Sequence, residues 1–118
     1  MKLGLQLSYW GTAPEKGLEL TLEAERLGFH SVWLAEAYGT DVFTPLAWLA
    51  AQTTTIRLAT GIAQMPPRTP AMMAMTATTL DMLSNGRVFW VLAHLDLRSS
   101  KVGMAYPSAN HLVELANM

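Results

Sequence analysis

The sequence has no cysteine, few charged residues and no long hydrophobic run. Without cysteine, disulfides and thiolate chemistry are excluded. Charged residues make up only 14% of the 118 positions and the net charge is −1, so no basic surface for nucleic acid is indicated. No apolar run reaches the roughly 18–20 residues that cross a membrane, and the first ten residues do not resemble a signal peptide. We therefore expect a cytoplasmic protein that binds neither nucleic acid nor membrane.

Residues that bind metals are also scarce. His30, His94 and His111 lie far apart and form no local motif, such as two histidines one helical turn apart. The methionines of "MMAM" lie in a predicted helix, which carries only some of the sulfurs on each side. We interpret these methionines as core residues rather than soft-metal ligands, and we expect no metal site.

Short hydrophobic runs are abundant. Hydrophobic residues make up 51% of the chain, and apolar runs begin at positions 3, 31, 56 and 87. This spacing is the length of one strand followed by one helix, which is typical of parallel β/α units. We predict a single domain over residues 1–118, with strands near 3–7, 31–35, 56–61 and 87–93.

Helix start signals lie between these strands. Pro14 precedes a segment with leucines on one side, which ends at Gly28. Thr44-Pro45 and Thr69-Pro70 share one arrangement: a hydroxyl that can cap free N–H groups, then a proline at the first helical position. Both pairs therefore predict a helix start.

The third predicted helix runs over about 70–84 and ends at Asn85-Gly86. Its predicted core face comprises Met72, Met75, Leu80 and Leu83. A last helix is predicted over 108–117, where apolar residues recur at helical spacing.

Four β/α units are half of a TIM, or (β/α)₈, barrel. Right-handed crossovers would place all the helices on one side of the sheet. An open doubly wound sheet is the alternative, but "SYWGTAPEKG" after the first strand lacks the Gly-x-Gly-x-x-Gly pattern of dinucleotide-binding folds. We therefore predict an α/β half-barrel of parallel units, with about four strands and three to four helices.

Four segments together resemble one protein family: "KLGLQLSYWG", "AERLGFHSVWLAEAYGTD", "TPLAWLAAQTTTIRLATGI" and "RTPAMMAMTATTLDMLSNGRVF". In this order they resemble the N-terminal half of the luciferase-like monooxygenases, (β/α)₈ oxidoreductases that depend on a flavin or on the deazaflavin F420. The resemblance covers residues 1 to about 90, and "TLDMLSNGR" is its most specific piece. It implies hydride transfer between F420 or FMN and a small organic substrate, and "AEAYG" is most similar to the F420-dependent branch.

One carboxylate, Glu36, lies at a predicted strand end. It follows the apolar run 31–35 and precedes a Tyr-Gly turn, and the loops after the strands form the active-site face of such a barrel. By the resemblance, Glu36 lies beside the deazaflavin as a catalytic residue that positions the ring or handles a proton. We expect its carboxylate to face the open mouth. A loop acid that accepts N–H bonds from its own turn is the alternative.

The resemblance implies further site residues. Gly61 and Ile62 end the third strand, where similar proteins have a bulge against the cofactor ring, often with a non-proline cis peptide. A loop glycine with positive φ is the alternative there. Tyr9 and Tyr38 follow the first two strands and would line the cofactor and substrate pocket, or else cover core edges. His94 follows the fourth strand and is placed for acid–base catalysis near neutral pH.

Two features depart from the family pattern. The family's barrel has eight strands whereas this chain has about four, and residues 94–118 form a divergent tail after the half-barrel of residues 1–93. Unpaired sheet edges invite pairing, so we expect a homodimer in which the fourth strand of each copy pairs with the first strand of the other. The alternative is that the tail folds over an edge and caps a monomer. The isolated chain is expected to bind F420 or FMN weakly or not at all. The alternative function is a non-catalytic relative that acts as an oligomeric half-barrel or binding module.

Overall fold

The computed structural model describes residues 1–8, 14–36, 40–96, 99–101 and 105–106, with backbone alone for Ser8 and from position 93 onward. Four strands alternate with three helices in the order β1 (Gly4–Ser8), α1 (Pro14–Arg26), β2 (Ser31–Ala35), α2 (Phe43–Gln52), β3 (Arg57–Gln64), α3 (Pro70–Leu83) and β4 (Val88–Asp96). The strands pair in parallel in chain order. The predicted α/β fold of parallel units is therefore confirmed.

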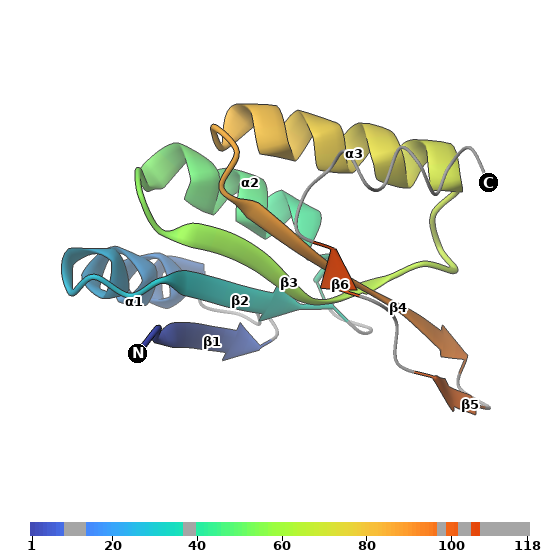
Figure 1. Ribbon diagram of the computed structural model, residues 1–118, viewed down its shortest axis with the longest axis horizontal. Helices are drawn as coiled ribbons and strands as arrows, with labels where there is room; N and C mark the ends of the chain where they lie inside the picture. Colours follow the sequence, from blue (N-terminus) through green and yellow to red (C-terminus); the bar gives the residue numbers. More distant parts are fainter. Residues whose placement is uncertain (9–13, 37–39, 97–98, 102–104, 107–118) are drawn as a thin grey trace.

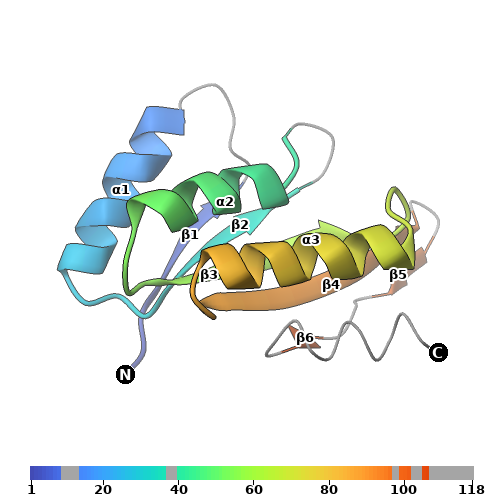
Figure 2. The same cartoon turned by 90° about the horizontal axis from the view of Figure 1, so that it is seen from above.

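The three helices cover one face of the sheet (Figures 1 and 2). Alternate strand residues, including Val32, Leu34 and Leu58, pack against Leu46 and Leu80 of the helices in one core. The residues between them point to the opposite face. We call this the inner face, and in paired rows it comprises Gly4, Gln6, Ser31, Trp33, Ala35, Arg57, Ala59, Ile62 and Phe89.

The buried side of α3 differs from the predicted one. Met73, Ala77 and Leu80 are buried, whereas Met72 is 51% exposed and Met75 is 59% exposed. Leu83, also expected in the core, is exposed as well. Apolar residues lie on more than one side of the helix, including the exposed Met72 and Met75 and the buried Met73 and Leu80, so its sequence does not select one face.

One of the two predicted helix caps is confirmed. The Thr69 hydroxyl accepts a hydrogen bond from the Met72 N–H at 3.2 Å, and Pro70 begins α3. The prediction for Thr44 is wrong, because α2 begins at Phe43 with Val42 at the N-cap, and the nearby Asp41 carboxylate accepts from the first N–H groups of the helix. Asp41 accepts from the N–H groups of Phe43 at 3.0 Å and Thr44 at 2.9 Å.

The "SNGR" segment between α3 and β4 has a structural explanation. Asn85 and Gly86 turn the chain with φ of 56° and 74°, a conformation that Asn and Gly tolerate best. The side chain of Arg87 then extends toward the C-terminal end of α2. Its guanidinium donates five hydrogen bonds of 2.7–3.1 Å, to oxygens of Ala50, Thr53, Ile56 and Ser84. The most specific piece of the family resemblance therefore stabilises the fold.

Glu25 ties the end of α1 to the loop before β3. One of its oxygens accepts the N–H groups of Thr54, Thr55 and Ile56 at 2.6–2.9 Å. Desolvation alone would raise the pKa of this carboxyl, but the hydrogen bonds from the loop together outweigh it, so its pKa lies below the ordinary value of 4.5.

The outer edge of β4 is paired within the chain, which differs from the open edge expected for the homodimer and agrees with the alternative in which the tail covers an edge. After β4 the chain forms β5 (Ser99–Lys101) and β6 (Ala105–Tyr106), and both pair with β4 in antiparallel fashion. In the described residues, β1 pairs with β2 alone. A homodimer that joins β4 to β1 would therefore have to displace β5 and β6.

Candidate functional site

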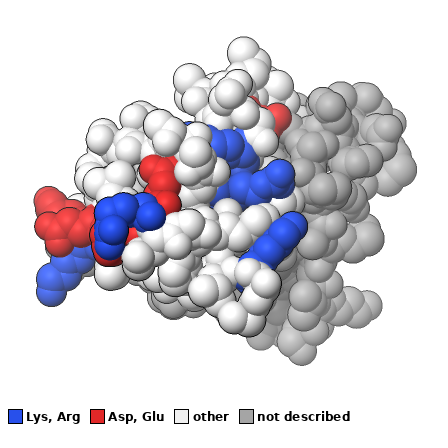
Figure 3. Space-filling model, turned by 60° about the vertical axis from the view of Figure 1, so that its left-hand side comes forward, with Lys and Arg blue, Asp and Glu red and all other residues white. Residues whose placement is uncertain are grey.

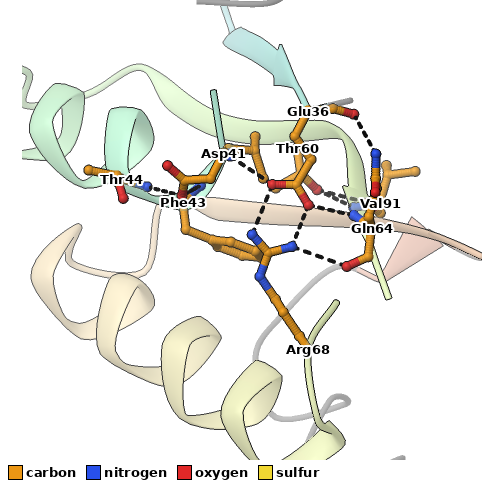
Figure 4. Close-up of polar contacts among 9 residues, drawn as sticks. Glu36, Asp41, Phe43, Thr44, Thr60, Gln64, Arg68 and Val91 are labelled. Atoms are coloured by element: carbon orange, nitrogen blue, oxygen red, sulfur yellow. Dashed lines mark hydrogen bonds and ion pairs between the residues drawn. The ribbon is translucent and has the colours of Figure 1, made fainter. Parts of the chain in front are cut away.

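Glu36 lies directly after β2 and is 5% exposed. Its carboxylate accepts the backbone N–H of Val42 at 2.9 Å and that of Gln64 at 2.7 Å (Figure 4). The two terminal nitrogens of the Arg68 guanidinium, Nη1 and Nη2, also donate to it, one to each oxygen. The side chain therefore joins the ends of β2 and β3 to the start of α2.

Arg68 reaches this carboxylate from the loop between β3 and α3. Its guanidinium lies 4.6 Å from the centroid of the Phe43 ring and donates to the Gln64 carbonyl at 3.1 Å. Its side chain is 18% exposed. Sequence reasoning missed Arg68, because its partner lies 32 positions away and nothing local marks a single arginine before a Thr-Pro pair.

The expected direction of Glu36 is wrong. Val32, Leu34 and Glu36 alternate along one side of β2, which faces the helices, and the contacts of Glu36 with Val42 and Arg68 lie there. Its two oxygens already accept four hydrogen bonds, so the carboxylate is not free to act as a base in this state. A direct role of Glu36 at a cofactor stays a prediction.

The bulge expected at Gly61 is present. Leu34 pairs with Thr60 and Ala35 with Ile62, so Gly61 is an extra residue in β3. On the other side of β3, the Thr60 hydroxyl bonds to both backbone groups of Val91, accepting at 2.7 Å and donating at 3.0 Å. The bulge is thus fixed from both neighbouring strands.

Gly61 is not the positive-φ loop glycine of the alternative interpretation. It lies within β3, and the glycines with positive φ in the described residues are Gly28 and Gly86. All described peptide bonds are trans. A Cβ at position 61 would lie 3.2 Å from the Leu34 carbonyl oxygen, 3.7 Å from the Gln6 amide nitrogen and 3.8 Å from the Ala35 Cβ. A side chain here would have to push the Leu34 carbonyl aside by a few tenths of an ångström, so the close approach to β2 favours glycine.

Around the bulge, the inner face carries small residues. Ala35, Ala59 and Gly61 present little more than backbone, and Gln6 and Trp33 flank them. The Ile62 carbonyl accepts the Glu36 N–H at 3.1 Å, which fixes the rim of this surface. This mostly apolar surface, which Ile62 borders through its pairing with Ala35, fits the face of a planar ring, with the Gln6 amide as a hydrogen-bonding group beside it.

The remaining predicted site residues lie outside the described residues or where the backbone alone is described. Tyr9 and Tyr38 are outside the described residues. Only the backbone of His94 is described, in β4 opposite Lys101. The structure thus brings Gly61 and Ile62 together with Glu36 at the ends of β2 and β3, and the roles assigned to all of these residues stay predictions.

The described residues hold no group of three or more His, Cys, Asp or Glu side chains placed to bind a metal ion. No helix among them is long and apolar enough to cross a membrane. A groove of about 400 Å³ does lie between α2 and α3, lined by apolar and threonine side chains, but it is far from the inner face and contains no ionisable group.

Comparison with known proteins places this geometry in context. The family model of the luciferase-like monooxygenases matches residues 3–97. A protein of Mycobacterium tuberculosis named as a coenzyme F420-dependent oxidoreductase is 52% identical over 88 residues, which are 74% of this chain and 25% of that protein.

Solved structures show the same arrangement. The coenzyme F420-dependent tetrahydromethanopterin reductase of Methanopyrus kandleri is 28% identical with a TM-score of 0.73, covering 82% of this chain and 28% of the reductase. The oxygenating constituent of 3,6-diketocamphane monooxygenase from Pseudomonas putida, solved with FMN, has a TM-score of 0.74 at 18% identity and shares the fold. The match covers 99% of this chain and 38% of that one. The chain therefore spans well under half of the length of these proteins.

Proposed function

This chain belongs to the luciferase-like monooxygenase family, and we propose that it contributes the first half of an F420- or FMN-dependent oxidoreductase barrel whose second half completes the site. The bound cofactor would supply the hydride chemistry. The chain's own residues would provide the surface on which the cofactor ring rests and would exclude water from one side of it. A small organic substrate would lie on the other side of the ring.

The observation that carries this proposal is the bulge of β3 on the inner face. Gly61, Ala35 and Ala59 leave room for a flat ring against the sheet, and Thr60 and Glu36 hold the bulge in place from opposite sides. The relative that is 52% identical is named for F420, which favours F420 over FMN. Glu36 and Arg68 then act as positioning residues, because their ion pair fixes the strand ends.

The test uses a chimaera in which the matched segment of this chain precedes the remainder of the M. tuberculosis relative. We expect F420 to bind this chimaera, as measured by fluorescence titration. Gly61→Val should weaken that binding at least about tenfold, because the side chain would press on the Leu34 carbonyl and the Gln6 amide and displace the bulge that forms the proposed floor. Ala71→Val, the matched control on the exposed side of α3, should leave binding unchanged. Equal binding by the Gly61→Val variant would contradict the proposed floor.

The second candidate is the non-catalytic binding module. It is favoured by β5 and β6, which occupy the edge of β4 where a barrel would continue with a parallel strand. A folded chimaera that binds neither F420 nor FMN would support this candidate instead.

A further inference from the structure

The Trp33 indole is held toward the starts of the strands. Trp33 lies on the inner face, and its Nε1–H donates to the Ser31 hydroxyl at 2.8 Å. Ser31 stands two positions earlier in β2 and is 3% exposed. A Cβ at Gly4 of β1 would lie 3.0 Å from the Trp33 Nε1 and 3.3 Å from its Cδ1. The indole therefore crosses from β2 onto the backbone of β1, where the absence of a side chain at Gly4 leaves room for it.

The two directions that this indole can take differ in chemistry. Alternate residues of a strand share one face and lie about 6.6 Å apart, so Trp33 has Ser31 on one side and Ala35 on the other. The Ser31 hydroxyl accepts the indole N–H, whereas the Ala35 methyl group offers no acceptor. The bulge lies next to Ala35, because a Cβ at Gly61 would stand 3.8 Å from the Ala35 Cβ. An indole turned toward Ala35 would therefore cover the surface beside Gly61.

A second aromatic side chain of the same row also has its partner nearer the strand starts. Trp33, Ala59 and Phe89 are paired neighbours across β2, β3 and β4. The Arg57 guanidinium, from two positions earlier in β3, lies 4.6 Å from the centroid of the Phe89 ring, where a cation is attracted to the ring face. Figure 3 turns this end of the molecule toward the reader, with Lys and Arg at the centre and lower right and most Asp and Glu to the left. Both aromatic side chains are thus engaged on the side away from the bulge.

Resting on the proposed function, we propose that Ser31 is a positioning residue that keeps the Trp33 indole out of the space of the planar cofactor ring. While Ser31 holds the N–H, the small residues Ala35 and Gly61 stay accessible to a ring. Without the hydroxyl, the N–H loses its partner, and another χ1 rotamer turns the indole toward Ala35. Ser31 then acts through Trp33 and does not itself touch the ring, and the pair determines how far a ring reaches toward the strand starts.

NMR spectroscopy of the chain itself tests the direction of the indole. The Trp33 indole signals are assigned by their loss in a Trp33→Phe variant. In the wild type we expect nuclear Overhauser contacts between the indole and the Hα atoms of Gly4. In Ser31→Ala we expect them between the indole and the Ala35 methyl group. A Ser31→Ala variant whose indole stays beside Gly4 would overturn the proposal, as would a wild-type indole beside Ala35.

The effect on the ring is measured by fluorescence titration of the chimaera with F420. Ser31→Ala should weaken binding at least about tenfold, whereas Ser31→Thr, which keeps the hydroxyl, should stay within about threefold of wild type. The double variant Ser31→Ala/Trp33→Ala should regain most of the loss, because it has no indole to turn. Thr79→Ala, a matched loss of a hydroxyl on the exposed side of α3, should leave binding unchanged.

Equal binding by the wild-type and Ser31→Ala chimaeras would overturn the proposal. So would a double variant that binds as weakly as Ser31→Ala alone, because a further truncation does not rescue a merely structural role. A chimaera that binds no F420 with Ser31 in place would contradict the proposed function instead. The NMR contacts of the chain itself do not depend on the cofactor, so they separate a failure of the proposed function from a failure of the role given to Ser31.

Discussion

Removal of the Arg87 guanidinium should destabilise the fold more than removal of any exposed arginine. The group donates five hydrogen bonds to four residues of α2, the loop before β3 and the end of α3. Hydrogen bonds from a charged donor contribute about 1.5–3 kcal/mol each, and the freed carbonyls regain only part of this from water. We therefore expect Arg87→Met, which keeps most of the apolar stem, to lower the free energy of unfolding by about 3–5 kcal/mol.

Urea denaturation followed by circular dichroism measures this effect. With a slope of about 1.5 kcal/mol per M, the midpoint should fall by about 2–3 M. Arg57→Met makes the same change at an exposed arginine whose guanidinium lies over the Phe89 ring near His30, and its free energy of unfolding should stay within about 1 kcal/mol of wild type. Equal midpoints for the two variants would refute the structural role assigned to Arg87.

Two further predictions concern the other buried or partly buried charges. Arg68→Met should lower the free energy of unfolding by about 2–4 kcal/mol, because it leaves the Glu36 carboxylate buried with two N–H partners only. The double variant with Glu36→Gln should recover part of this loss in urea titrations, and an additive double variant would argue against the ion pair. Glu25 has a folded pKa below 4.5, so its stabilisation is present above that pH and is lost as the pH falls through the folded value. Glu25→Gln should therefore lower the melting temperature at pH 7. It should also make the melting temperature fall less steeply as the pH drops below about 4.5, and a fall as steep as that of the wild type would contradict this prediction.

The sequence contained enough to predict the parallel β/α units. Strand spacing, Thr69-Pro70 and Asn85-Gly86 depend on local chemistry, and the structure confirms each of them. The start of α2 was misplaced because Asp41 and Thr44 are both good capping residues three positions apart. The core side of α3 was misjudged because hydrophobic residues surround that helix.

For the candidate site, one signal was overlooked and one was absent. The alternation that buries Val32 and Leu34 also turns Glu36 toward the helices, so its direction could have been read from the sequence. Arg68 could not have been found in this way, since an ion pair across 32 positions leaves no local pattern. The bulge at Gly61 was predicted from family resemblance, and the close approach of the Leu34 carbonyl gives its physical reason.

The most direct test of the central claim is to compare F420 binding by the isolated chain and by the chimaera with the relative's second half. The account predicts that the isolated chain, shown to be monomeric by sedimentation, does not bind F420 at micromolar concentration, because half of the cofactor's surroundings are missing. The chimaera should bind it. Micromolar binding by the monomeric chain, or a folded chimaera without binding, would contradict the account.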